Sequence, residues 1–239
     1  MKSTEFNLDF KREERTGLSE AIFCGGKSTK QINAILEAIS KAGRSVLLTH
    51  LTSDKFQEFS IELKSCIDFD PSSNTGFFST PYPLLPSKNI AIITAGTSDA
   101  AVAAEAARTL TFFGHRYELI QDIGVAGLWR LLDRVDEIEK FPIIIVVAGM
   151  DGALPTVIGG LVSGAIIALP TSVGYGAAES GRTALNASLT SCTSGIVAVN
   201  IDNGYGAACA AIRMLTAASR SNWPSGSSDC KAAFSEAVG

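Results

Sequence analysis

Asp151 is the first residue in this sequence that suggests catalysis. It stands in a turn between Gly149 and Gly152, directly after the apolar run IIIVVA. A lone carboxylate there either caps a helix that begins near Ala153 or acts as a general base in an apolar pocket, where desolvation would raise its pKa. Because two other turns of similar composition carry reactive groups, we favour the general base.

Cys192 is the candidate nucleophile. It lies beside Ser191 in TSCTSG, a turn of small polar residues just before another apolar run. A thiol in such a turn, near amides that bind phosphate, can ionise and attack a substrate. Most free cysteines are instead small buried hydrophobic residues. That is the role we expect for Cys24, Cys66 and Cys209.

The turn GTSD, from Gly96 to Asp99, follows an apolar run and opens a helix. Its backbone N–H groups and the hydroxyls of Thr97 and Ser98 are suited to a phosphate at the positive end of the helix dipole. Ser98 or Asp99 could equally cap the helix. The sequence leaves both roles open.

Long cationic side chains gather near the start of the chain, at Lys11, Arg12, Arg15 and Lys27. A run of charge is usually a solvated helix face, yet the fork of an Arg side chain suits phosphate recognition. We therefore expect Arg12, Arg15 and Lys27 to contact an anionic ligand or to brace the loop that does.

The elements around these turns bring them together. From residue 89 onward apolar runs alternate with helical patterns, which predicts a parallel, doubly wound α/β sheet of the flavodoxin type. The expected strands are 89–95, 116–121, 143–148, 165–169 and 196–201, and the expected helices are 98–113, 123–136, 153–163, 176–190 and 205–219. Ligands bind beyond the carboxyl ends of such strands, so the GTSD and Asp151 turns should share one small-molecule site. We interpret the chain as an enzyme built around these two turns and the turn that carries Cys192.

The first 87 residues differ in composition from the rest of the chain and predict a small α/β N-terminal subdomain. It has apolar runs at 20–24 and 45–50 and a helical pattern at 28–43. Four prolines indicate a linker at 70–88. The expected division is therefore 1–87, 88–220 and a C-terminal tail at 221–239.

Composition excludes several classes of protein. The chain has 239 residues, 46% of them hydrophobic, and its net charge of −4 argues against a nucleic-acid partner. The segment 143–170 is apolar, but its glycines, Asp151 and Pro155 favour two strands and a helix over a membrane span. Five cysteines without a CxxC pair favour a reducing, cytoplasmic setting. His50 and His115 lack partners at ligand spacing, so we expect structural roles.

Two helical segments, AAVAAEAA and GAACAA, are built almost entirely from small residues. Small side chains allow close helix contact. In a chain with a mean hydropathy of +0.23 we expect these faces to be buried against other subunits.

Together these segments resemble the LarB-type family of pyridinium-3,5-biscarboxylic acid mononucleotide synthases, which begin nickel-pincer nucleotide cofactor biosynthesis. The matching blocks are LDFKREERTGLSEAIFCGGKSTKQI, GTSDAAVAAEAA, DIGVAGLWRLLDR, VVAGMDGALPTVIGGLV, PTSVGYGA and LNASLTSCTSGIVAVNIDNGYGAA. The C-terminal half is also similar to the PurE-type aminoimidazole ribonucleotide carboxylases. Those enzymes have a His where this chain has Ala153.

The LarB-type resemblance implies an enzyme that carboxylates nicotinic acid adenine dinucleotide at pyridine C5 with CO2 and then releases AMP. It places Cys192 at the nucleophile position and Asp151 where the family commonly has Glu. It implies Mg²⁺ for the phosphoanhydride step, no organic cofactor, and a homo-oligomer with an octamer favoured. Asp99, Asp122 and Asp202 end strands and are the candidates for contact with the ion or the substrate.

Two other classes of function stay open. One is an aminoimidazole ribonucleotide carboxylase or mutase, against which Ala153 argues. The other is a non-catalytic nucleotide-binding module, which would have no need of Cys192 together with Asp151.

Overall fold

The apolar runs of the C-terminal half form one parallel sheet. In the computed structural model, which describes residues 6–219, the strands lie in the order β6-β5-β7-β8-β9. Their bounds are β5 (Lys88–Thr94), β6 (Arg116–Ile120), β7 (Ile143–Ala148), β8 (Ala165–Pro170) and β9 (Val197–Ala198). Every pairing is parallel. This is the flavodoxin-type order, as predicted, and the expected tail at 221–239 lies outside the described residues.

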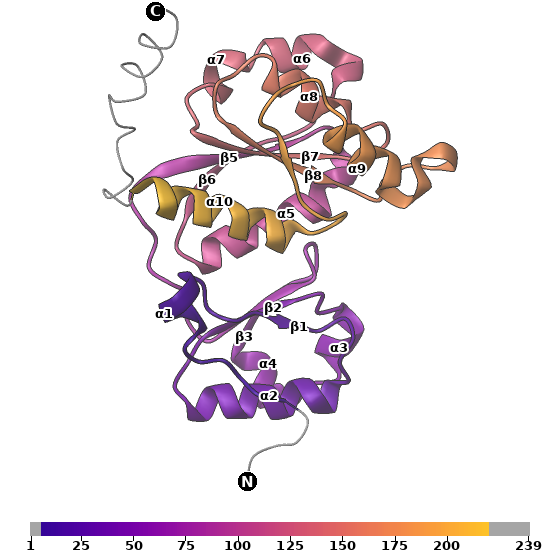
Figure 1. Cartoon of the computed structure of the whole chain (residues 1–239). Coiled ribbons are helices and arrows are strands. Elements are labelled where there is room, and N and C mark those ends of the chain that lie inside the picture. Colours follow the sequence, from indigo (N-terminus) through magenta and orange to yellow (C-terminus); the bar gives the residue numbers. More distant parts are fainter. Residues whose placement is uncertain (1–5, 220–239) are drawn as a thin grey trace, which may run out of the picture.

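Helices cover both faces of this sheet (Figure 1). One face carries α6 (Leu128–Leu132), α7 (Val135–Ile138), α8 (Ala153–Gly159) and α9 (Arg182–Leu189), and the other carries α5 (Ala100–Phe112) and α10 (Gly204–Ser219). Short 3₁₀ segments, η1 (Thr97–Asp99), η2 (Val125–Gly127) and the kinked η3 (Gly176–Gly181), precede α5, α6 and α9. The apolar segment 143–170 is strand, helix and strand, and no helix in the described part of the chain is long and apolar enough to cross a membrane.

The single helix expected at 123–136 is wrong. The segment is divided into η2, α6 and α7, with a break at Asp133 and Arg134. At the break the N–H of Arg134 bonds to the carbonyl of Leu131, three residues back, so the α-helical pattern is lost. Apolar spacing continues through the break, which is why periodicity alone did not reveal it.

The N-terminal half forms a four-stranded mixed sheet in the order β1-β2-β4-β3. Its strands are β1 (Ile22–Phe23), β2 (Val46–Thr49), β3 (Ile67–Asp70) and β4 (Thr75–Phe78), and its helices are α1 (Arg12–Thr16), α2 (Thr29–Lys41), α3 (Ser53–Gln57) and α4 (Ile61–Ser65). Ser28 and Gln31 form a capping box at the start of α2. Helix α2 buries its apolar stripe against the sheet face that points away from the C-terminal half.

The linker expected at 70–88 is too long, because its first part belongs to the β3–β4 hairpin. The polar residues that suggested a linker build the hairpin turn: the carboxylate of Asp70 accepts hydrogen bonds from the backbone N–H groups of Ser72 and Ser73 at 3.3 and 3.1 Å. Only residues 79–87 connect the two sheets without regular structure. Turn residues and linker residues have the same composition, so sequence could not separate them.

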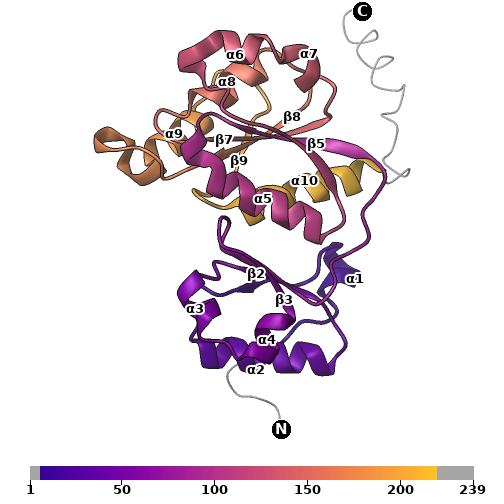
Figure 2. The ribbon, with the colours of Figure 1, turned by 180° about the vertical axis from the view of Figure 1, so that it is seen from behind.

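The small-residue helices are buried within this chain, contrary to the expectation that other subunits would cover them. Helices α5 and α10 lie between the two sheets (Figures 1 and 2). One continuous core joins Leu47 and Phe77 of the N-terminal sheet to α5, α10 and the C-terminal strands. Ala residues suit this layer because both sides of each helix are covered.

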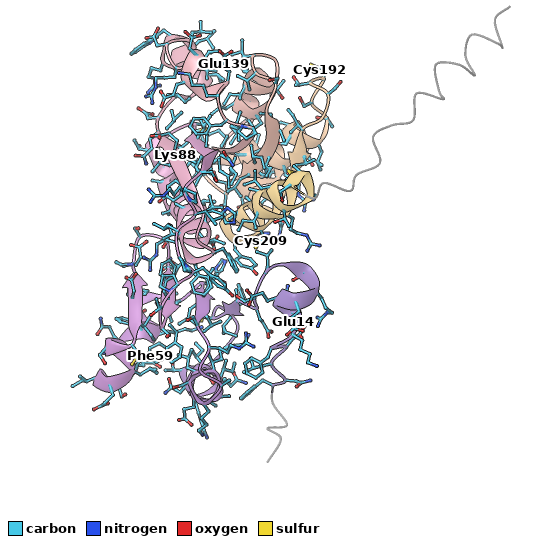
Figure 3. All side chains as sticks on the ribbon, turned by 90° about the vertical axis from the view of Figure 1, so that its left-hand side faces the viewer. Glu14, Phe59, Lys88, Glu139, Cys192 and Cys209 are labelled. Carbon is cyan, nitrogen blue, oxygen red and sulfur yellow. The ribbon has the colours of Figure 1, made fainter. Side chains whose placement is uncertain are left out.

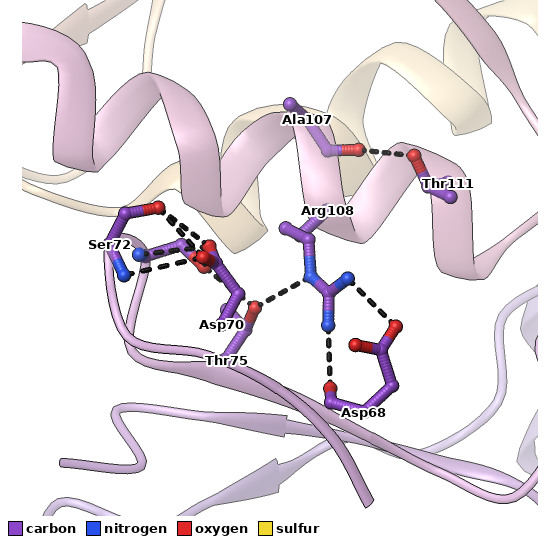
Figure 4. Close-up of polar contacts among 8 residues, drawn as sticks. Asp68, Asp70, Ser72, Thr75, Ala107, Arg108 and Thr111 are labelled. Atoms are coloured by element: carbon purple, nitrogen blue, oxygen red, sulfur yellow. Dashed lines mark hydrogen bonds and ion pairs between the residues drawn. The ribbon is translucent and has the colours of Figure 1, made fainter. Parts of the chain in front are cut away.

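A second contact between the halves is polar (Figure 4). Arg108 of α5 reaches the β3–β4 hairpin, where Nη1 lies 3.0 Å from Asp68 Oδ2, Nη2 donates to the Asp68 carbonyl at 2.7 Å, and Nε donates to the Thr75 hydroxyl at 3.2 Å. Its guanidinium lies 3.7 Å from the centre of the Phe77 ring. The N-terminal half is thus attached to the helix that begins at the GTSD turn.

Candidate functional site

The carboxyl ends of β5 and β8 are joined through one buried carboxylate. Asp99 is only 3% exposed. Its Oδ2 accepts the backbone N–H of Gly96 at 2.9 Å, and its Oδ1 accepts the hydroxyl of Thr171 at 2.7 Å. Thr171 comes directly after β8 and is fully buried. Asp99 therefore has a structural role, and its partner Thr171 is a residue that sequence reasoning missed.

The other two polar residues of the GTSD turn are free for a ligand. Thr97 and Ser98 are exposed at the start of α5, while Asp99 holds the turn from within. The structural role falls to Asp99, and ligand binding by Thr97 and Ser98 stays a prediction. Hydroxyls and N–H groups at this helix start suit an anionic group.

Asp122 follows β6 by two residues, at the carboxyl edge of the sheet, and it pairs with a cation that sequence reasoning missed. Its backbone N–H bonds to the hydroxyl of Thr94 at 3.1 Å, and its Oδ2 lies 2.6 Å from Nη1 of Arg130. Arg130 lies eight residues away, in α6. Because the intervening turn was read as helix, the pair had no signal in the sequence.

The turn after β7 requires both of its glycines. A Cβ at Gly149 would lie 2.5 Å from the Thr171 hydroxyl, and Gly152 has a φ of +64° with the backbone of Ala184 closely packed against it. Asp151 between them is exposed, so the expected apolar pocket around its carboxylate is absent from the single chain. Its Oδ1 accepts the N–H of Ala153 at 3.2 Å. The carboxylate thus contacts the start of α8 and still faces solvent.

The loop that carries Cys192 is attached to the same helix. Ser191 Oγ accepts the hydroxyl of Thr156 at 2.8 Å and the N–H of Thr193 at 3.1 Å. The Thr193 hydroxyl in turn donates to the Thr156 carbonyl at 3.0 Å. Thr156 lies in α8, which begins two residues after Asp151, so one short helix positions both candidate catalytic residues.

The cysteines of the described chain differ sharply in their surroundings. Burial raises the pKa of Cys24 to about 12 and that of Cys209 to about 11, so both thiols stay protonated near neutral pH. Cys66 is exposed at the end of α4, contrary to the expectation that it would be buried, because α4 lies at the surface. Cys192 is exposed in the loop that joins α9 to β9.

The N-terminal cations do not join these turns within one chain. Arg12 and Arg15 lie in α1, where Arg15 pairs with Asp9 at 2.5 Å, and Lys27 donates to the Phe23 carbonyl at 2.9 Å. Figure 3 shows Glu14, also in α1, far from Cys192. Contact between these cations and a substrate stays a prediction.

The expected Mg²⁺ has no ready-made site. Within residues 6–219, no three His, Cys, Asp or Glu side chains are grouped to hold a metal ion. Asp99 is buried in its own hydrogen bonds, Asp122 pairs with Arg130, and Asp202 Oδ1 accepts the N–H of Ser172 at 2.8 Å. The residues present do not fit a protein-held ion, so no step is assigned to one. An ion carried in on substrate phosphates would need no such cluster.

Two known protein families match this chain, one in each half. Residues 2–79 match the LarB/PurE-like N-terminal domain, and residues 89–226 match AIR carboxylase. The chain belongs to the AIR carboxylase family. It carries the LarB/PurE-like N-terminal domain in addition, as the resemblance of its sequence blocks implied.

Relatives of this AIR carboxylase family member include the uncharacterized protein MJ0165 of Methanocaldococcus jannaschii. The two are 38% identical over 210 residues, which cover 84% of this chain and 80% of the relative. Solved structures that are similar include a PurE2 variant and PurE, both of Treponema denticola, at 25% and 23% identity and a TM-score of 0.46. They cover 55% and 57% of this chain and 82% of each of theirs.

Replacing Thr171 with Val should test the junction at Asp99. Val keeps the shape but removes the donor to a buried carboxylate, which should lower the free energy of unfolding by about 2 kcal/mol. That corresponds to a fall in melting temperature of roughly 4–8 °C for a chain of this size. Calorimetry of the purified variant measures it.

Thr109→Val is the matched control. Thr109 is as buried as Thr171, but its hydroxyl donates to the Glu105 carbonyl in its own helix at 2.8 Å. Its loss should be less than half as large, because the acceptor is uncharged. Equal losses in the two variants would remove the special role of the Asp99 junction.

Proposed function

We propose that this protein adds CO2 to C5 of the pyridine ring of nicotinic acid adenine dinucleotide and then hydrolyses the phosphoanhydride to release AMP. The product would be pyridinium-3,5-biscarboxylic acid mononucleotide. The family assignment and the LarB-type sequence blocks support this reaction class. The observation that carries it is the exposed thiol of Cys192, in a turn that hydrogen bonds hold against α8, the helix that follows Asp151.

The chemistry explains why a thiol is needed. A pyridinium ring is electron-poor and does not attack CO2. When the Cys192 thiolate forms a C–S bond to the ring, the ring becomes a dihydropyridine whose C5 is nucleophilic like that of an enamine. C5 then forms a bond to CO2. Loss of the C5 proton to a base lets the electron pair restore the aromatic ring as the C–S bond breaks, so the thiolate is regenerated and no oxidant is consumed.

Asp151 is the base that the chain offers for the C5 proton. Ala153 occupies the position at which the similar carboxylases have a His, and a methyl group cannot carry a proton. Asp151 lies two residues earlier, with its carboxylate exposed and oriented by the N–H of Ala153. Acid–base work at this turn therefore falls to Asp151.

The phosphates of the dinucleotide require hydrogen-bond donors at the carboxyl edge of the sheet, where the Asp151 turn lies. We assign Thr97 and Ser98 to this role because both are exposed at the start of α5. Arg130 adds a cation. Its guanidinium pairs with the half-exposed carboxylate of Asp122 and has further N–H donors that can bind a phosphate.

Cys192→Ser should lower carboxylation by roughly a thousandfold or more, because a serine hydroxyl is a far weaker nucleophile than a thiolate near neutral pH. The melting temperature should stay unchanged, since the side chain is exposed. Cys66→Ser, which alters another exposed thiol, is the control and should keep full activity. Near wild-type turnover in Cys192→Ser would overturn the mechanism.

Asp151→Asn separates the two halves of the reaction. An amide cannot accept the ring proton, so the variant should form the cysteinyl adduct but not complete turnover. Mass spectrometry of the intact protein incubated with the dinucleotide should then show the adduct at Cys192. Full turnover by Asp151→Asn would assign the base elsewhere.

We also propose a homo-oligomer, with an octamer favoured. Exposed apolar residues support it, and they gather on the face of the C-terminal sheet that the N-terminal half leaves open: Leu128, Trp129 and Leu132 of α6 and Leu189 of α9. Light scattering should give a multiple of the 25.0 kDa chain mass. Trp129→Lys should shift it toward smaller species, because a charge is then placed in the interface. A wild-type monomer at micromolar concentration contradicts this assembly.

A further inference from the structure

A cavity of about 340 Å³ lies between the two halves of the chain, apart from the turns that carry Cys192 and Asp151. Its N-terminal side is formed by β1, the end of β2 and the residue that follows it, and its C-terminal side by α5 and the segment that joins β9 to α10. The side chains that decide its chemistry are Phe23, His50, Glu105, Asp202, Asn203 and Tyr205.

One wall of the cavity is aromatic. The rings of Phe23 and His50 lie with their centres 4.8 Å apart, and Phe23 is 51% exposed although it belongs to a strand. An exposed ring beside a cavity is a platform on which a nucleobase can stack. His50, expected to be structural, therefore also lines a candidate ligand site.

The opposite wall is acidic. Glu105 is 5% exposed, with its Oε1 3.7 Å from Nε2 of His50. Burial raises the pKa of the Glu105 carboxyl, while His50 and the N–H groups of Gly204 and Tyr205 oppose that rise and Asp202 adds to it. Glu105 and Asp202 both line the cavity, and carboxylates repel a phosphate. They suit sugar hydroxyls instead, as in nucleotide sites where Asp or Glu binds a ribose.

The acidic wall is connected to the proposed reaction site. The N–H of Asp202 bonds to the carbonyl of Pro170 at 2.9 Å, and its carboxylate accepts the N–H of Ser172. The next residue, Val173, accepts the N–H of Met150 at 2.7 Å, and Met150 adjoins Asp151. Hydrogen bonds through the segment after β8 therefore connect the cavity to the Asp151 turn.

We infer that this cavity binds the nucleoside end of the dinucleotide, with the base on Phe23 and His50 and the ribose hydroxyls at Glu105 and Asp202. The inference rests on the proposed function, since it assigns a place to the half of the substrate that leaves as AMP. The pyridine ring then lies near Cys192. The phosphates lie at the carboxyl edge of the sheet with Thr97 and Ser98, which are not among the residues that line the cavity.

Calorimetric titration of the full-length protein with three probes tests this placement: adenosine, nicotinic acid mononucleotide and the intact dinucleotide. Phe23→Ala should weaken adenosine and dinucleotide binding about tenfold, the usual size of a lost base-stacking contact, and leave the mononucleotide unchanged. Phe10→Ala is the control, because Phe10 is also a half-exposed Phe of the N-terminal half and lies outside the cavity. Melting temperatures of both variants establish that they are folded.

The outcomes distinguish this inference from the proposed function. If adenosine does not bind, or binds Phe23→Ala as tightly as the wild type, the cavity assignment is wrong even if the dinucleotide is carboxylated. If Phe23→Ala loses adenosine but the wild type carboxylates nothing, the cavity binds a nucleoside and the proposed reaction is wrong. Equal weakening in Phe10→Ala would also overturn the assignment.

Discussion

The buried carboxylate of Asp99 is the constraint on which the site depends. Strands β5 and β8 are not neighbours, since β7 lies between them, yet the Thr171 hydroxyl reaches Asp99 across the end of β7. This hydrogen bond explains why residue 149 is Gly, because a Cβ there would lie 2.5 Å from the Thr171 hydroxyl. One ionic hydrogen bond thereby fixes the GTSD turn, the Asp151 turn and the start of the segment after β8. A buried charge is tolerable here because both of its oxygens are occupied.

The second organising feature is the shared helical layer. Helices α5 and α10 lie between the two sheets, and their many Ala residues let them pack closely there. Helix α5 begins at the GTSD turn, carries Glu105 into the interdomain cavity and holds the N-terminal hairpin through Arg108. The N-terminal half therefore bears directly on the geometry of the site, although none of its residues lies among the strand-end turns.

The sequence predicted the parallel sheet well because its central strands, β5, β7 and β8, are apolar runs buried on both faces, a pattern that is typical of strands covered by helices on each side. It singled out Thr97, Ser98, Asp151 and Cys192 as candidates because each follows or precedes an apolar run. It did not find Arg130 or Thr156, since their partners lie 8 and 35 residues away and only the folded chain joins them. Thr171 was within reach, because PTS follows an apolar run as GTSD does. The β3–β4 hairpin was missed because its Ser-rich turn has the composition of a linker.

The central claim is that the exposed thiol of Cys192, held beside α8, supports carboxylation of a pyridine ring and not of an imidazole. Full-length protein incubated with Mg²⁺ and labelled bicarbonate should be given nicotinic acid adenine dinucleotide in one arm and aminoimidazole ribonucleotide in another. The account predicts acid-stable label in a pyridine mononucleotide, with AMP released in equal amount, and no label in the second arm. Label that appears only with aminoimidazole ribonucleotide, or with neither compound, would contradict it.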